Sequence, residues 1–167
     1  SSPDGAYVIT TSSLGLHVWE LASGKMRQKL KIFLSPFDDC IFFPKELKII
    51  ATHFNEISLW DIKKGKFKKS FPGSAPIALS SDGQWILHGV QNQQSLALSE
   101  IRTGRKQIKL IGHTSKILCA SLNLKNSFAV SGAMDGTLIF WDLLTGVIQR
   151  KIHAHTNHVW QCEITTD

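Results

Sequence analysis

Residues 112–146 read G-H-T-S-K-I-L-C-A-S-L-N-L-K-N-S-F-A-V-S-G-A-M-D-G-T-L-I-F-W-D-L-L-T-G, and this stretch decides the fold. Its β-rich runs, together with the one that follows it, lie at residues 117–122, 127–131, 137–141 and 147–152. Asp135-Gly136 separates the second run from the third, and Asp-Gly is a strong short-range signal for a β-hairpin. The stretch therefore predicts a small antiparallel sheet built from these runs in order.

The same pattern recurs along the chain. A Trp-acid step or its equivalent stands at Trp19-Glu20, Trp60-Asp61, Ser99-Glu100 and Trp141-Asp142, with spacings of 41, 39 and 42 residues. Each step is followed by a glycine five residues after its first member, and apolar residues flank each step at matching positions. Columns that align over all of these units identify a repeat array, in which each repeat packs on its neighbours.

Gly112-His113 and Trp141-Asp142 resemble the Gly-His and Trp-Asp dipeptides that mark a unit of the WD-repeat family. The resemblance implies an all-β, partial β-propeller of about four blades of four-stranded antiparallel sheet, not closed into a ring. Propellers of this family usually have about seven blades. We therefore expect the chain to be a fragment of a larger WD-repeat protein, with the remaining blades of the same propeller among its partners.

The predicted blade boundaries follow the repeat. They are an incomplete blade at 1–31, a second blade at 32–71, a degenerate third blade at 72–110, the best-matched blade at 111–152, and the first strand of a truncated next blade at 153–167. The second unit has Asn55-Glu56 in place of Asp-Gly and the third has Ser99 in place of Trp. We expect these two units to keep the shape of a blade while losing its polar network.

The open ends lead to a further expectation. The last strand, predicted at residues 159–164, would expose Val159, Trp160 and Ile164, and the strand at residues 7–11 would be open at the other end. Exposed apolar edges favour aggregation. The isolated chain is therefore predicted not to behave as a well-folded monomer.

The resemblance also implies a hydrogen-bonded chain of polar residues inside the best-matched blade. The matching residues are His113, Ser131, Asp135 and Trp141. A serine, a histidine and an aspartate could also form a hydrolase triad, but a triad needs an exposed nucleophile beside an oxyanion hole. Because these residues occupy the scaffolding columns of the repeat, we predict that the chain is not an enzyme and has no catalytic residues.

Metal and thiol chemistry have little support in the sequence. Only His153, His155 and His158 have metal-like spacing, and no cysteine or carboxylate stands close by to complete a tetrahedral set. We therefore predict no metal site and no cofactor. The cysteines, Cys40, Cys119 and Cys162, are odd in number and lack a C-x-x-C motif, which favours buried free thiols and a reducing compartment.

The composition is that of an ordinary globular chain. Of its 167 residues, 43% are hydrophobic, and no apolar run approaches the roughly 18 residues that span a membrane. We expect no transmembrane segment and an intracellular location, cytoplasmic or nuclear. The net charge of +6 is too modest to indicate nucleic-acid binding by itself.

The positive charges have a pattern of their own. The predicted outer strands carry alternating basic residues, namely Lys25, Arg27, Lys29 and Lys31 in one unit and Lys66 and Lys68 in the next. Basic residues on an edge strand prevent edge-to-edge pairing. The alternative is an anion-binding rim for an acidic partner, nucleic-acid phosphate or anionic lipid. Few aromatic residues are interleaved for base stacking, which lowers the nucleic-acid option.

Family resemblance implies a non-catalytic scaffold that mediates protein–protein interactions within a larger protein or complex. Partners of the family commonly dock where loops enter the first strand of a blade and where the turns between second and third strands emerge. The residues expected there are Phe54, Thr114, Lys116, Met134, Thr156 and His158. Protein or peptide partners are thus expected. An enzyme built on a propeller is the less favoured rival, because it would need convergent carboxylates or a metal in the central channel.

Overall fold

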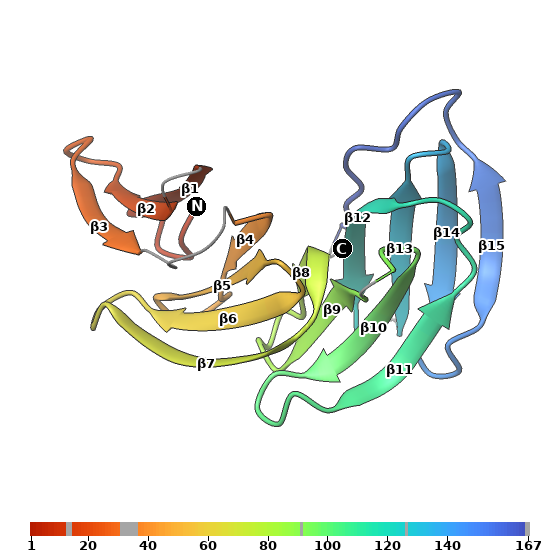
Figure 1. The fold of residues 1–167 in the computed structure, drawn as a ribbon, viewed down its shortest axis with the longest axis horizontal. Helices are drawn as coiled ribbons and strands as arrows, with labels where there is room; N and C mark the ends of the chain where they lie inside the picture. Colours follow the sequence, from red (N-terminus) through yellow and green to blue (C-terminus); the bar gives the residue numbers. More distant parts are fainter. Residues whose placement is uncertain (13–14, 31–36, 91, 126, 166–167) are drawn as a thin grey trace. The chain divides into compact units, whose positions relative to one another are not determined.

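A computed structural model describes residues 1–12, 15–30, 37–90, 92–125 and 127–165. Every regular element in these residues is a β-strand, and none of the described residues is helical (Figure 1). Accordingly, the described part of the chain holds no helix long and apolar enough to cross a membrane. The chain divides into two compact units, Ser1–Ser74 and Ala75–Asp167.

The first unit holds two antiparallel sheets, each a simple meander in chain order. The first blade has three strands, β1 (Tyr7–Ser12), β2 (Gly15–Glu20) and β3 (Met26–Leu30). The second blade has four, β4 (Asp39–Phe42), β5 (Lys48–His53), β6 (Glu56–Asp61) and β7 (Lys66–Pro72).

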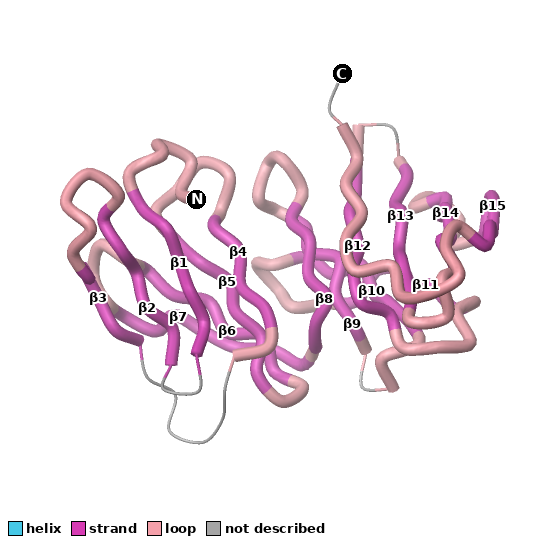
Figure 2. The backbone as a smooth tube through the Cα atoms, turned by 90° about the horizontal axis from the view of Figure 1, so that it is seen from above, coloured by secondary structure: helices cyan, strands magenta, loops and turns pink. Residues whose placement is uncertain are grey.

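The sheets of the second unit are both four-stranded, and their strands also follow one another in chain order (Figure 2). The third blade consists of β8 (Ser74–Leu79), β9 (Trp85–Gly89), β10 (Ser95–Glu100) and β11 (Lys106–Ile111). The fourth consists of β12 (Ile117–Asn123), β13 (Phe128–Ala133), β14 (Thr137–Asp142) and β15 (Ile148–His153). The all-β class and the partial β-propeller with about four blades are confirmed.

Burial within a blade falls from the middle strands to the outer strand. β5 and β6 are almost wholly buried, on both faces of their sheet, and the buried positions include polar residues such as Thr52 and Ser58. By contrast, β15 is almost wholly exposed. The core of the second unit contains the fully buried Leu96, Ile139 and Trp141. The outer strand therefore contributes backbone hydrogen bonds and charged side chains to the blade, but few buried apolar side chains.

All of the blades share a register shift between their last two strands. The shift falls between Val18/Trp19, Leu59/Trp60, Leu98/Ser99 and Phe140/Trp141. A β-bulge at this point increases the local twist of the outer strand. Because the bulge is retained next to Ser99, the third blade keeps the backbone geometry of its neighbours even though the tryptophan of the repeat is missing.

The segment after β15 differs from its sequence prediction. Residues 159–164 do not form a strand; instead, Val159 N–H donates to the Ala133 carbonyl at 3.1 Å and Ile164 N–H donates to Ser121 Oγ at 3.1 Å. These bonds tie the segment to β12 and β13 without a continuous ladder, which is what a strand requires. The predicted exposure of Val159 is wrong, because only 4% of this residue is exposed. Ile164 is half-buried, whereas Trp160 is exposed as expected.

Candidate functional site

A continuous hydrogen-bonded network runs through the fourth blade. Trp141 Nε1–H donates to Ser131 Oγ at 2.8 Å, and the same hydroxyl lies 2.8 Å from His113 Nε2. On the other side of the ring, His113 Nδ1 lies 3.2 Å from Thr137 Oγ1, whose hydroxyl donates to Asp135 Oδ1 at 2.6 Å. The network therefore joins β13, β14, the turn between them and the loop that enters β12.

The proton positions in this network follow from electrostatics. Burial lowers the pKa of His113 to about 4, and the nearby Asp135 carboxylate raises it only in part. The ring is therefore neutral near pH 7. If its proton is on Nδ1, every donor in the network has an acceptor. The protons then point from Trp141 to Ser131 to Nε2, and from Nδ1 through Thr137 to Asp135.

The terminal carboxylate is adapted to this arrangement. Burial raises the pKa of Asp135. Hydrogen bonds from the Thr137 hydroxyl, the Thr137 amide and Thr114 lower it by more than burial raises it, so the net shift is downward. Thr137 was not among the residues expected in the network, although its position two residues after the turn aspartate is visible in the sequence. Ser131 is fully buried and held between Trp141 and His113, so it is not placed as a nucleophile.

Related hydroxyl–ring pairs occur in the other blades. Trp19 Nε1–H donates to Thr10 Oγ1 at 2.8 Å, and Trp60 Nε1–H donates to Ser58 Oγ at 3.0 Å. In the third blade, His88 Nε2 lies 2.9 Å from Ser99 Oγ. The second and third units therefore each retain one hydroxyl–ring contact, although the full set of residues of the fourth-blade network does not recur in their sequences. Sequence reasoning missed these residues because none of the pairs keeps the cross-strand serine–tryptophan arrangement of the fourth blade. Thr10 stands in place of the serine in the first blade, and Ser58 lies on the same strand as Trp60 in the second. In the third blade, the ring and the hydroxyl have exchanged strands.

The turns at one end of the fourth blade form an exposed surface, which we call the loop surface. It comprises Thr114, Lys116, Met134, Thr156 and His158, all expected from the sequence, and Trp160, which was not among the expected binding residues. Met134 is 38% exposed and Trp160 is 73% exposed. The Trp160 ring stacks on His158 with centroids 5.2 Å apart.

Backbone hydrogen bonds hold these turns together. Met134 N–H donates to the Lys116 carbonyl at 2.9 Å, which joins the β13–β14 turn to the loop that enters β12. The amides of Ala154 and His155 both donate to the Gly136 carbonyl, at 3.0 and 3.2 Å. The side chains of the loop surface thus project from a backbone that is fixed by the blade rather than from a free loop.

Comparison with known proteins agrees with this geometry. The model of the family described as "WD domain, G-beta repeat" matches residues 104–142, which cover the hairpins of the hydrogen-bonded network. Residues 104–142 therefore match one WD repeat.

Similarity to longer WD-repeat relatives extends over more of the chain. The chain is 27% identical to Autophagy-related protein 16 of Arabidopsis thaliana, and the match covers 91% of the chain and 31% of the relative. It is 25% identical to the Chromatin assembly factor 1 subunit FAS2 homolog of Oryza sativa subsp. japonica over 83% of its length and 26% of the relative. With Protein NEDD1 of Bos taurus, the identity is 24% over 65% of the chain and 18% of the relative. The chain thus spans about a third or less of the length of these relatives.

The remaining expected binding residue, Phe54, lies in the first unit of the chain. It occupies the turn between β5 and β6, with 66% of the residue exposed and a φ of 44°. A left-handed backbone is uncommon for a bulky residue and marks a position held by its surroundings. Phe54 and the loop surface therefore belong to separate units and are treated as separate candidates.

The basic residues lie on edge strands, as β3 and β7 each end their sheet. Arg27 and Lys29 are exposed on β3 and Lys25 is exposed just before it, while Lys31 lies outside the described residues. On β7, Lys66 is exposed, and Lys68 Nζ lies 3.6 Å from Asp61 Oδ2. The structure thus brings Lys68 to a carboxylate, which reduces the positive charge that it offers to an external anion.

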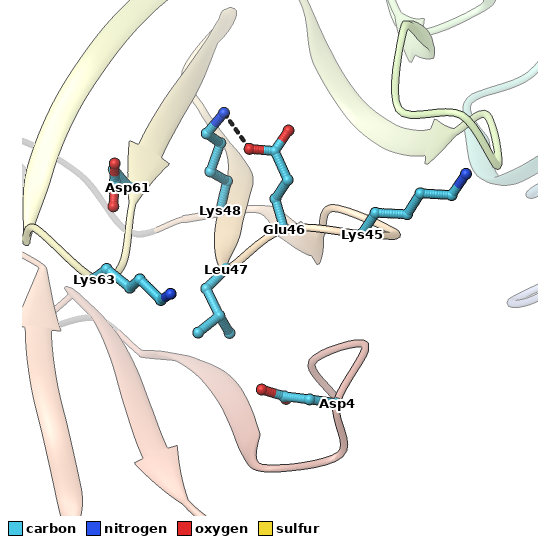
Figure 3. Close-up of a pocket in the computed structure, with 7 residues that line it drawn as sticks. All are labelled: Asp4, Lys45, Glu46, Leu47, Lys48, Asp61 and Lys63. Carbon is cyan, nitrogen blue, oxygen red and sulfur yellow. Dashed lines mark ion pairs between the residues drawn. The ribbon is translucent and has the colours of Figure 1, made fainter.

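A groove of mixed charge opens in the first unit (Figure 3). It has a volume of about 390 Å³ and is lined by Asp4, Lys45, Glu46, Leu47, Lys48, Asp61 and Lys63. Lys48 Nζ lies 2.5 Å from Glu46 Oε2, so part of its charge is internally paired. No sequence motif indicated this groove, because separate turns of the first and second blades contribute its residues. Within the described residues, no group of three or more His, Cys, Asp and Glu is arranged to hold a metal ion.

Proposed function

We propose that this chain is a non-catalytic WD-repeat scaffold that binds a protein or peptide partner through the loop surface of the fourth blade. The observation that carries the proposal is the exposure of Met134 and Trp160 beside backbone hydrogen bonds of the blade, made by Met134 itself and by Val159, the neighbour of Trp160. Aromatic and methionine side chains are enriched at protein interfaces. Since the backbone of the turn at Met134 is already ordered, binding there costs little conformational entropy.

A scaffold role fits the placement of the polar residues. In the fourth blade the serine, histidine and aspartate of the repeat hold strands and turns together, and the serine hydroxyl is buried. The printed name of the rice relative describes a subunit of an assembly factor, which supports a role within a complex. We also propose that the protein acts inside the cell, in the cytoplasm or the nucleus.

Substitution of the loop surface tests this function. Partners captured by the intact protein are identified first, and each is then titrated against Trp160→Ala, Met134→Ala and Lys116→Ala. We expect Trp160→Ala to weaken binding by about tenfold or more, as truncation of a buried interface aromatic commonly does. Leu144→Ala is the matched control, because Leu144 is 77% exposed but lies in the β14–β15 turn, at the opposite end of the sheet.

Equal binding by all of these variants would place the partner elsewhere. Phe54→Ala then tests the corresponding turn of the second blade, in the first unit. Loss of binding with Phe54→Ala alone would move the proposed interface from the fourth blade to the second.

A second candidate function is anion binding by the basic outer strands. It is favoured by the exposure of Arg27 and Lys29 on an edge strand. Affinity for phosphate-rich ligands falls steeply as the salt concentration rises. Titration of the protein against anionic vesicles or RNA at two salt concentrations, with an Arg27→Gln/Lys29→Gln variant as the comparison, separates this function from peptide binding. Binding that is insensitive to salt and to this variant would eliminate it.

A further inference from the structure

Two cysteines that are distant in sequence meet at the fourth blade. Cys119 lies on β12, whereas Cys162 lies in the segment that follows β15. The interaction between the two thiols lowers the pKa of Cys119 and raises the pKa of Cys162. In addition, Cys119 Sγ lies 3.4 Å from the Val159 carbonyl oxygen, and Cys162 Sγ lies 3.8 Å from the Val130 carbonyl oxygen.

The register of the sheet explains this meeting. β12 and β13 pair Cys119 with Gly132 and Ser121 with Val130. Because alternate residues of a strand share a face, Cys119 and Ser121 lie on the same face of the sheet. Ser121 Oγ accepts the Ile164 amide at 3.1 Å on that face, so the segment crosses the sheet where Cys119 lies.

Gly132 makes the close approach possible. A Cβ added at this glycine would lie 2.4 Å from Val159 Cγ1 and 2.8 Å from Cys119 Sγ, which is too close for either contact. The absence of a side chain therefore lets the segment lie directly on the backbone of β13. The packing of Val159 on Gly132 and the bond from Ile164 to Ser121 therefore hold Cys162 near Cys119.

The local environment also makes Cys119 the more reactive thiol. The hydrogen bond from Cys162 lowers the pKa of Cys119, burial raises it, and the Gly132 amide lowers it, with a net downward shift. Cys40, on β4, has the opposite environment, since burial and the neighbouring Asp39 raise its pKa to about 11. Because the thiolate is the reactive form, we expect Cys119 to react faster than Cys40.

We propose that Cys119 and Cys162 are an oxidative modification site, a dithiol that hydrogen peroxide closes to a disulfide. The Cys119 thiolate attacks one oxygen of the peroxide, the O–O bond breaks, and the hydroxide that leaves takes up a proton to become water. The sulfur of Cys162 then attacks the resulting sulfenic acid, and the second oxygen leaves as water. Two thiols are oxidised to one disulfide, and one peroxide is reduced to two waters.

The disulfide fastens the segment that carries His158 and Trp160 to β12. In the reduced protein this segment is held by single hydrogen bonds and by the packing of Val159. A covalent link removes its ability to lift away from the blade. The consequence for partner binding rests on the proposed function of the loop surface, whereas formation of the disulfide does not.

Peptide mass spectrometry tests the disulfide directly. The native protein is treated with limiting hydrogen peroxide, the remaining thiols are alkylated, and the protein is digested without reduction. We expect a peptide pair linked through Cys119 and Cys162, two hydrogens lighter than the sum of its parts, while Cys40 remains alkylated. Amide exchange in residues 154–165 should slow by about tenfold or more on oxidation, since local opening is suppressed.

Single substitutions supply the controls. Cys119→Ser and Cys162→Ser should each abolish the link and the change in exchange, whereas Cys40→Ser should leave both intact. The exposed position of the segment makes Cys162→Ser informative even if Cys119→Ser impairs folding. Alkylation of both Cys119 and Cys162 after peroxide, preferential oxidation of Cys40, or only intermolecular disulfides would overturn the proposal.

Binding measurements separate this site from the proposed function. A disulfide that forms and alters partner affinity supports both. A disulfide that forms without changing affinity supports the oxidative site and removes its regulatory consequence. If Trp160→Ala also leaves affinity unchanged, the proposed interface itself is wrong while the dithiol stands.

Discussion

His88 and Ser99 of the third blade occupy the positions that Ser131 and Trp141 hold in the fourth, so the ring and the hydroxyl have exchanged strands. The registers make the positions equivalent, since Ile86 lies opposite Ser99 as Ala129 lies opposite Trp141, with His88 and Ser131 two residues further on. The hydroxyl–ring contact is retained, at 2.9 Å in the third blade and 2.8 Å in the fourth. The third blade thus keeps a hydroxyl–ring contact at this site, although the residues at the two positions differ from those of the fourth blade.

A double-mutant cycle tests this exchange. We expect Ser99→Trp alone to overfill the site beside His88, and His88→Ser alone to leave a cavity. The double variant recreates the serine–tryptophan arrangement, so the two substitutions should couple favourably by roughly 1–3 kcal/mol in the free energy of unfolding. Denaturant titration measures the coupling. Additivity within about 0.5 kcal/mol would show that the two positions are independent.

Trp141 supplies both packing and a hydrogen bond, and two substitutions separate them. Trp141→Ala should reduce the free energy of unfolding by roughly 2–4 kcal/mol, because the fully buried ring leaves a cavity. Trp141→Phe keeps most of the packing and should cost about 1 kcal/mol for the lost donor to Ser131. Trp160→Ala is the exposed control and should change stability by less than about 0.5 kcal/mol. Equal losses for Trp141→Ala and Trp160→Ala would contradict the assigned burial.

The stability of the fourth blade should depend on pH through His113. Its pKa falls from 6.5 to about 4 on folding, so the unfolded chain takes up a proton that the folded ring does not. The stabilisation is complete above pH 6.5 and is lost as the pH falls toward 4, with a total of about 3 kcal/mol. Unfolding measured by amide exchange of β12–β15 across this range checks the slope.

Two variants calibrate that measurement. His113→Gln should flatten the dependence between pH 6.5 and 4, because the neutral amide does not titrate. His158→Gln is the comparison variant, because this histidine lies outside the network. Buried His88 also has a lowered pKa and contributes in the same direction, so some dependence should persist in His113→Gln. An unchanged slope in His113→Gln would exclude His113 as its source.

Gly136 should be far less tolerant of a side chain than another glycine with the same backbone. Gly136 and Gly24 have φ values of +79° and +64°. A Cβ added at Gly136 would lie 1.9 Å from the His155 carbonyl oxygen, whereas a Cβ added at Gly24 would meet no atom within 4 Å. We expect Gly24→Ala to cost about 1 kcal/mol, from strain in the left-handed region. Gly136→Ala should cost more and release residues 154–158 from the β13–β14 turn, which amide exchange detects. Equal costs would show that the close approach carries no energy.

Much of this architecture could be predicted from the sequence because it is local. Asp135-Gly136 specifies a hairpin, and the recurring step at Trp19, Trp60, Ser99 and Trp141 indicates one sheet per unit. Strand pairing within each blade joins neighbours in the chain, so periodicity and turn residues are sufficient to predict it. The sequence also placed the side chains of the fourth-blade turns on one exposed surface, because their positions follow from the hairpins.

Tertiary structure decided the contacts that join distant residues or depend on close approach. Thr137 entered the network because its hydroxyl fits between His113 and Asp135, which no residue spacing specifies. Residues 159–164, predicted as a strand, instead lie on β12 and β13, because the bare backbone at Gly132 accepts Val159. That packing also brings Cys162 to Cys119. A sequence pattern records which face a residue occupies, but the space left by a missing side chain on a neighbouring strand exists only once the strands have paired.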